Sequence, residues 1–256
     1  MENSLNILIV QADLIWESTA GNISAFNAIL AGTDADLIIL PEMFLSGFTM
    51  NPSEVAETME GEAVKWMVGK AAQLNSALCG SLVIEQDGQY YNRLLFVTPS
   101  GEIRHYDKRH LFTLAGEHRV YASGKERLII DYKGWRICPL VCYDLRFPVF
   151  SRNDADYDLL IYVANWPKPR IAAWDTLLNA RAVENMCYVA GVNRVGIDAN
   201  GHRYPGHSQV VDCFGNVLAK REDEAGTLQI RLDRKSLQEA RKKFPFLEDR
   251  DDFTVK

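Results

Sequence analysis

The feature that most constrains the fold is a series of ten short runs rich in β-branched, aliphatic and aromatic residues, each ended by turn residues. Such runs predict strands. Between them lie stretches with apolar residues at helical spacing. Many strands interleaved with a few helices predict a mixed α/β protein. The predicted strands lie within residues 5–14, 35–44, 77–86, 90–99, 126–132, 135–144, 157–166, 186–196, 208–220 and 226–233, and the predicted helices within 21–32, 61–75 and 172–186.

Several of these runs are apolar at nearly every position, which predicts sheets that are covered on both faces. Three Gly-containing segments, 85–91, 98–104 and 212–218, predict antiparallel hairpins as well. No linker-like or low-complexity stretch interrupts the 256 residues, so we expect a single domain over residues 1–256.

Residues 234–256 form a charged tail around the aromatic segment "KFPFLED". Two interpretations remain open for it. The tail is either a helix followed by an arm that reaches a neighbouring subunit, or a solvated end of the chain.

The charge balance and the first residues narrow the class of protein. Lysine and arginine total 28 against 34 acidic residues, and a net charge of −6 argues against a nucleic-acid partner. The first residues lack a basic segment, and their apolar run is too short for a signal peptide or a membrane span. An odd count of five cysteines fits reduced thiols. We therefore expect a cytoplasmic protein that has no membrane partner.

A metal site is not predicted. Cys138 and Cys142 lie four residues apart, and no His-x-x-x-His pair or acidic cluster accompanies them.

The segment "LIILPEMF" places a carboxylate at the end of a predicted strand. Pro41 cannot donate a ladder hydrogen bond, so the strand should end there. Glu42 would then lie at the edge of the core, where burial raises the pKa of a carboxyl group toward neutrality. Such a group suits general acid–base catalysis. Alternatively, Glu42 has no catalytic role, and its carboxylate is simply hydrogen-bonded at the end of the strand.

The segment "HYDKRHLF" places an ammonium after another predicted strand. If Lys108 points into a cleft, it can stabilise a developing oxyanion. Taken alone, the segment equally fits a solvated basic turn.

The segment "WRICPLVCYDLRFP" ends an apolar strand on a thiol. Cys142 would occupy a strand-to-helix turn, where a nucleophile is exposed and the next backbone N–H can point at an oxyanion. Because a free thiol has a pKa of about 8.5, this cysteine needs a base or a positive neighbour. Spacing leaves a Cys–His pair open with any of His105, His110, His118, His202 and His207. The other cysteines lie in apolar runs and are expected in the core: Cys79, Cys138, Cys187 and Cys213.

Together the three segments resemble the carbon-nitrogen hydrolase (nitrilase) superfamily, whose hallmark is a Glu-Lys-Cys triad in three separate motifs. Glu42 in "LPEMF", Lys108 in "YDKRHLF" and Cys142 in "VCYDLRFP" match in type, order and spacing. The resemblance covers almost the whole chain, and the sequences of the motifs are most similar to those of the bacterial omega-amidase branch. It implies a four-layer α-β-β-α sandwich of two mixed sheets flanked by helices, and a homodimer formed through the outer helical layer.

The resemblance also implies the roles of the residues. Cys142 would be the nucleophile, Glu42 the base, and Lys108 with the backbone N–H of Tyr143 the oxyanion stabilisers. Glu117 in "AGEH" matches a supporting glutamate that holds the lysine or the substrate amide. The expected reaction releases ammonia from small omega-amides of dicarboxylic acids, such as 2-oxoglutaramate, through a thioester and without a cofactor.

Substrate contacts are less defined. Asn165 and Trp166 in "VANWP" follow a strand at the same end of the sheet, so they are expected to wall the pocket. Trp166 alternatively belongs only to the core. Arg146 either pairs with a substrate carboxylate or braces an acidic residue such as Asp144.

Related activities remain alternatives. A nitrilase proper usually carries Trp-Glu after the cysteine, whereas this chain has Tyr143 and Asp144. A deaminated-glutathione amidase and an N-carbamoyl amide hydrolase stay open, because specificity resides in loops. A catalytically dead scaffold would have lost a triad member, and a glutamine-dependent amide-transfer module would need an appended synthetase domain.

Overall fold

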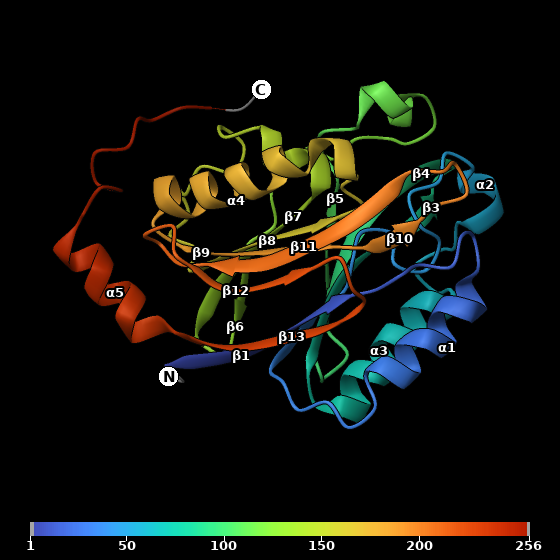
Figure 1. The fold of residues 1–256 in the computed structure, drawn as a ribbon, viewed down its shortest axis with the longest axis horizontal. Helices are drawn as coiled ribbons and strands as arrows, with labels where there is room; N and C mark the ends of the chain where they lie inside the picture. Colours follow the sequence, from blue (N-terminus) through green and yellow to red (C-terminus); the bar gives the residue numbers. More distant parts are fainter. Residues whose placement is uncertain (1–2, 255–256) are drawn as a thin grey trace.

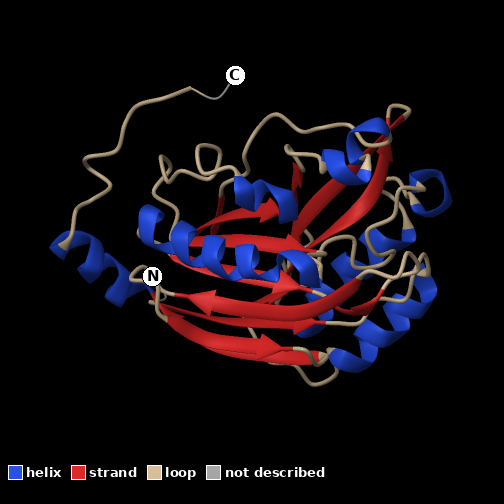
Figure 2. Cartoon of the chain, turned by 45° about the horizontal axis from the view of Figure 1, so that its top comes forward, coloured by secondary structure: helices blue, strands red, loops and turns tan. Residues whose placement is uncertain are grey.

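Two β-sheets pack face to face and carry helices on their outer faces. The computed structural model describes residues 3–254. Figures 1 and 2 show the layers, with α1 (Thr19–Ile29) and α3 (Glu62–Leu74) outside one sheet and α4 (Ile171–Asn185) outside the other. The predicted α-β-β-α sandwich of two mixed sheets is confirmed.

The first sheet has six strands in the order β13-β1-β2-β3-β4-β5. Its parallel centre joins β1, β2 and β3, and antiparallel strands complete both edges. The strands are β1 (Ser4–Gln11), β2 (Leu37–Ile39), β3 (Ala77–Gln86), β4 (Gln89–Val97), β5 (Ile103–Asp107) and β13 (Gly226–Asp233).

The second sheet has seven strands in the order β10-β11-β9-β8-β7-β6, with β12 paired to β11. Here β7, β8 and β9 form the parallel centre. The strands are β6 (Ile130–Tyr132), β7 (Trp135–Val141), β8 (Leu159–Ala164), β9 (Tyr188–Asn193), β10 (Val195–Ile197), β11 (Arg203–Val211) and β12 (Val217–Glu222).

The runs that are apolar at nearly every position form the parallel strands at the centre of each sheet. Parallel neighbours need a crossover connection, and α1, α3 and α4 supply it between β1 and β2, β2 and β3, and β8 and β9. One continuous core fills the space between the sheets, and a second lies between the first sheet and its helices. The carboxyl ends of the parallel strands therefore meet on a rigid frame.

The three predicted hairpins are confirmed as the turns β3–β4, β4–β5 and β11–β12. Two predicted runs are each divided between two strands, 186–196 into β9 and β10 and 208–220 into β11 and β12. Of run 35–44, only Leu37–Ile39 is strand, because Pro41 ends the ladder and Met43 has a positive φ of 44°.

The tail begins with the helix α5 (Arg234–Lys243), whose Leu237 and Ala240 are buried. Asp233 caps this helix by accepting a hydrogen bond from the Lys235 N–H at 2.9 Å. Beyond it, Phe244 packs against the core whereas Phe246 is 59% exposed. The helix matches one of the two interpretations, and an arm on a neighbouring subunit stays a prediction.

Across residues 3–254, no helix is both long enough and apolar enough to span a membrane.

Candidate active site

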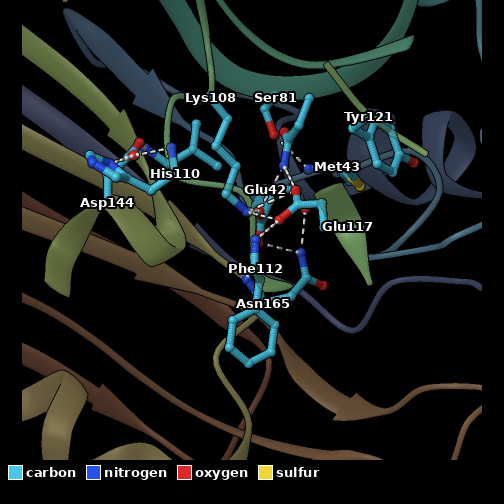
Figure 3. Close-up of polar contacts among 12 residues, drawn as sticks. Glu42, Met43, Ser81, Lys108, His110, Phe112, Glu117, Tyr121, Asp144 and Asn165 are labelled. Atoms are coloured by element: carbon cyan, nitrogen blue, oxygen red, sulfur yellow. Dashed lines mark hydrogen bonds and ion pairs between the residues drawn. The ribbon is translucent and has the colours of Figure 1, made fainter. Parts of the chain in front are cut away.

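The three predicted catalytic side chains converge at the carboxyl ends of strands from both sheets. Glu42 follows β2, Lys108 follows β5, and Cys142 follows β7 directly. Figure 3 shows Glu42, Lys108 and Glu117 pointing toward one another. Two sheets that face each other thus bring together residues up to 100 positions apart in the chain (Glu42 to Cys142).

Lys108 lies between two buried carboxylates. Its Nζ donates to Glu42 Oε1 at 2.9 Å and to the two carboxylate oxygens of Glu117 at 3.0 and 2.9 Å. All three side chains are fully buried. The interpretation of Lys108 as part of a solvated basic turn is therefore wrong. Of the two roles predicted for Glu117, to hold the lysine or to hold the substrate amide, the structure shows the contact with the lysine.

Two asparagines complete the shell around Glu42. Asn92 Nδ2 donates to Glu42 Oε1 at 2.8 Å and to Glu117 at 3.3 Å, so it bridges the two carboxylates. The Asn165 backbone N–H donates to Glu42 Oε2 at 2.8 Å, and its side-chain amide donates to the Glu42 carbonyl at 2.7 Å. Glu42 is thereby fixed from both sheets at once.

Cys142 opens a single-turn helix, η3 (Cys142–Arg146), and has a left-handed φ of 45°. A non-glycine residue in this region is strained and marks a functional site when the surroundings hold it there. The residue as a whole is partly exposed, but its thiol is buried and lies within hydrogen-bonding reach of Glu42. Tyr143 is the second residue of η3, so its backbone N–H has no acceptor within that helix.

Asp144 holds this turn in place. Its carboxylate accepts from the Val141 N–H at 2.9 Å, from the Tyr106 hydroxyl at 2.8 Å and from the His110 N–H at 3.1 Å. These bonds tie the cysteine turn to β5 and to the segment after Lys108. Figure 3 shows His110 directed at Asp144 and away from the Glu42–Lys108 group.

The histidines do not form the base in this geometry. His110 Nδ1 lies 2.7 Å from Asp144, and His207 Nδ1 lies 2.7 Å from Asp175. His105 and His118 are exposed, and His202 is exposed and lines the cavity. Glu42 is the group placed against the thiol, so the Cys–His alternative loses its support.

Burial and charge set the resting protonation states. Burial lowers the pKa of Lys108, but the carboxylates of Glu117 and Glu42 outweigh it and hold that pKa above its ordinary value. Burial and the nearby Glu42 carboxylate raise the pKa of the Cys142 thiol well above its usual range. Burial also raises the pKa of Glu117. The site therefore rests with a protonated ammonium and a neutral thiol.

A cavity of about 520 Å³ opens above these groups. Glu42, Lys108 and Cys142 line it, together with aromatic side chains such as Trp166 and Tyr143. Concave sites with an apolar lining and a few convergent polar groups are typical of small-molecule pockets.

The remaining predicted residues all line this cavity. Asn165 lines the cavity, and its backbone N–H and its side-chain amide both donate hydrogen bonds to Glu42. Trp166 is only 3% exposed and belongs to the core as well as to the pocket wall. Arg146 lies over the Trp166 ring at 5.0 Å, and it does not brace Asp144, whose partners are named above.

Sequence inspection missed several contributors. Asn92 stands out only as a polar residue inside the apolar run of β4, and Asp144 only as the acid two residues after the cysteine. Ser81 on β3 accepts from the Met43 N–H at 2.8 Å and so supports the positive-φ turn after Glu42. Arg170 lines the cavity from the short turn between β8 and α4 and had no motif of its own.

Known proteins resemble this chain over its whole length. The family model described as carbon-nitrogen hydrolase matches residues 8–242. The chain belongs to the carbon-nitrogen hydrolase family. An omega-amidase, YafV, from Escherichia coli K12 is 46% identical over 98% of both chains. The resemblance to the nitrilase superfamily and its omega-amidase branch is thus confirmed.

Two further relatives place the chain within this family. A 2-oxoglutaramate amidase from Bacillus subtilis is 33% identical over 84% of this chain and 85% of its own. The crystal structure of XC1258 from Xanthomonas campestris, a CN-hydrolase superfamily protein with an arsenic adduct in its active site, covers 100% of both chains at 44% identity and a TM-score of 0.98.

Within the described residues, no group of three or more His, Cys, Asp or Glu side chains is arranged to hold a metal ion.

Proposed function

We propose that this protein is an amidohydrolase that releases ammonia from omega-amides of dicarboxylic acids, such as 2-oxoglutaramate. The observation that carries the proposal is a cysteine that lines a small-molecule cavity and lies against a buried Glu–Lys–Glu cluster. Relatives with omega-amidase and 2-oxoglutaramate amidase activity support the substrate class.

In the first half-reaction, Cys142 Sγ attacks the amide carbon while Glu42 accepts the thiol proton. A neutral resting thiol needs such a base at the moment of attack, and Glu42 is the carboxylate within its reach. The tetrahedral oxyanion lies near the Lys108 ammonium and the free Tyr143 N–H. Lys108 makes a bidentate contact with Glu117, so one of its hydrogens can turn to the oxyanion while the ion pair persists.

The leaving nitrogen then takes the proton from Glu42 and departs as ammonia, which leaves an acyl thioester on Cys142. In the second half-reaction Glu42 deprotonates a water that attacks the thioester, and the thiol recovers its proton as the acid product leaves. The arsenic adduct in the Xanthomonas relative fits a reactive thiol in this position, since arsenic is a soft element that thiolates bind well.

The test is a steady-state comparison of ammonia release from 2-oxoglutaramate, glutamine, deaminated glutathione, an N-carbamoyl amine and a simple nitrile. We expect the highest kcat/KM with 2-oxoglutaramate. Glutamine should be much poorer, because its α-ammonium would be desolvated without a partner. A higher kcat/KM with deaminated glutathione or the carbamoyl compound would contradict the omega-amide substrate class and assign that compound's class instead. A lack of turnover with every compound would contradict the enzyme assignment.

Three further properties belong to the proposal. The reaction uses no cofactor, so chelator-treated protein should keep its rate. The five free thiols suit the reducing cytoplasm. The chain forms a homodimer through the layer that contains α4, where Val183 is 48% and Phe214 is 54% exposed.

A further inference from the structure

Two arginines line the cavity besides Lys108: Arg146 and Arg170. Arg170, which belongs to none of the triad motifs, ends the single turn η4 (Lys168–Arg170) before α4. The residue is half-buried. Its position follows from Trp166 and Pro167, which lead the chain from β8 across the cavity wall.

The Arg170 guanidinium has no carboxylate partner among residues 3–254. Its side chain instead lies over the Phe112 ring at 5.0 Å. The acids that line the cavity are Glu42 and Asp198. Glu42 already accepts a hydrogen bond from the Lys108 ammonium. Asp198 accepts from the Tyr204 hydroxyl at 2.8 Å and from the N–H groups of its own turn. A planar fork of N–H donors therefore remains available to a ligand.

The backbone of Arg170 is held firmly. Its carbonyl accepts from Trp166 Nε1 at 2.7 Å, and its N–H donates to the Pro167 carbonyl at 3.0 Å. Phe112, on which the guanidinium lies, donates its own N–H to the Glu117 carboxylate. The guanidinium thus rests on a ring whose backbone contacts the residue that holds Lys108, so little conformational freedom would be lost when a ligand binds Arg170.

The charge of the cavity floor makes such a cation necessary for an anionic substrate. With a neutral thiol, one ammonium faces the carboxyl groups of Glu42 and Glu117, so the floor offers no surplus positive charge. A substrate with an amide at one end and a carboxylate at the other would bring its amide to this floor. Its carboxylate must then find a cation farther out in the cavity.

We propose that Arg170 binds the terminal carboxylate of the substrate in a bidentate manner and thereby selects omega-amides that carry one. This inference rests on the proposed function. Arg146 also lines the cavity, but it is exposed and water screens its charge, so it discriminates less. The half-buried arginine forms the stronger charge-assisted hydrogen bonds.

The test uses two amides of equal chain length, glutaramate and pentanamide, which differ only in the terminal carboxylate. Ammonia release gives kcat/KM for each, and their ratio measures selection for the carboxylate. For Arg170→Gln we expect this ratio to fall at least about tenfold, mainly through the KM for glutaramate. Arg170→Lys should restore part of the ratio, because it keeps the charge and loses the fork.

Lys168→Gln is the matched control. It removes a cation from the same turn, is exposed, does not line the cavity, and should leave the ratio unchanged. Pentanamide turnover by Arg170→Gln reports that the variant is folded and has an assembled triad.

The outcomes separate the two claims. Wild-type protein that hydrolyses neither amide would contradict the proposed function. Wild-type protein that prefers glutaramate, together with an Arg170→Gln variant that keeps this preference, would overturn the inference alone. Loss of the preference in Arg146→Gln but not in Arg170→Gln would also overturn it.

Discussion

At the scale of single residues, the site is built around one lysine that two carboxylates hold. Glu42 and Glu117 bind the same ammonium, yet only Glu42 also lies against the Cys142 thiol. Breaking a buried ion pair leaves an uncompensated charge, so this cluster is rigid and costly to alter. Its geometry separates two roles: one carboxylate positions the lysine, and the other is available for proton transfer.

Replacement of Glu42 by Gln tests the second role. Glutamine keeps the size and an acceptor oxygen but cannot accept the thiol proton, so kcat should fall by about 10²–10⁴-fold. The measurement is ammonia release from 2-oxoglutaramate, with the thermal unfolding midpoint as a control for folding. Activity near that of wild type would assign the base to another group.

The protonation state of the thiol is a second prediction at this scale. Because burial and Glu42 raise the pKa of Cys142, this thiol should stay protonated at pH 8, whereas an ordinary thiol with a pKa of about 8.5 is partly ionised there. The check is the thiolate absorbance near 240 nm in wild type minus Cys142→Ala between pH 6 and pH 9. A thiolate signal already present at pH 7 would indicate a preformed Cys–Lys ion pair instead.

At the scale of elements, the strand ends explain how much the sequence could predict. The runs before Glu42 and Cys142 are apolar and end in residues that break a strand, so both strand ends were foreseeable. Asn92 was not, because its role arises only when β4 lies beside β3, one strand away from β2, and Glu117 comes within hydrogen-bonding distance of its side chain. Arg170 was missed for the same reason: its partner ring, Phe112, lies 58 positions earlier in the chain.

The packing of α4 on the second sheet gives a prediction for this scale. Gly191 on β9 lies beneath α4, and a Cβ there would come within 2.4 Å of Leu178 and 2.9 Å of Trp174. Gly191→Ala should therefore lower the free energy of unfolding by about 1–3 kcal/mol.

The matched control for that change is Gly69→Ala. Gly69 lies in α3, where an added Cβ meets nothing within 4 Å, so alanine should raise the free energy of unfolding by up to about 1 kcal/mol. Denaturant unfolding of the two variants measures both changes. Equal stability of Gly191→Ala and wild type would show that the α4–β9 contact is not tight.

At the scale of the whole molecule, the two sheets act as a frame that joins distant segments at one edge. The outer surface of α4 and the neighbouring β11–β12 hairpin leaves Val183 and Phe214 exposed, which suits contact with a second copy. We expect sedimentation of the wild-type protein as a dimer and of Val183→Arg as a monomer. Ile15→Arg, on the other side of the sandwich before α1, should remain dimeric, and a wild-type monomer at micromolar concentration would contradict the proposed interface.

The central claim is that amide hydrolysis proceeds through the thiol of Cys142. The most direct measurement is the rate of ammonia release from 2-oxoglutaramate by Cys142→Ala, made alongside wild-type protein that is quenched in acid during turnover and analysed by mass spectrometry. We predict no release above background from the variant, an unchanged unfolding midpoint, and an acyl adduct of substrate minus ammonia on the wild-type peptide that contains Cys142. Sustained ammonia release by a folded Cys142→Ala protein would contradict the account.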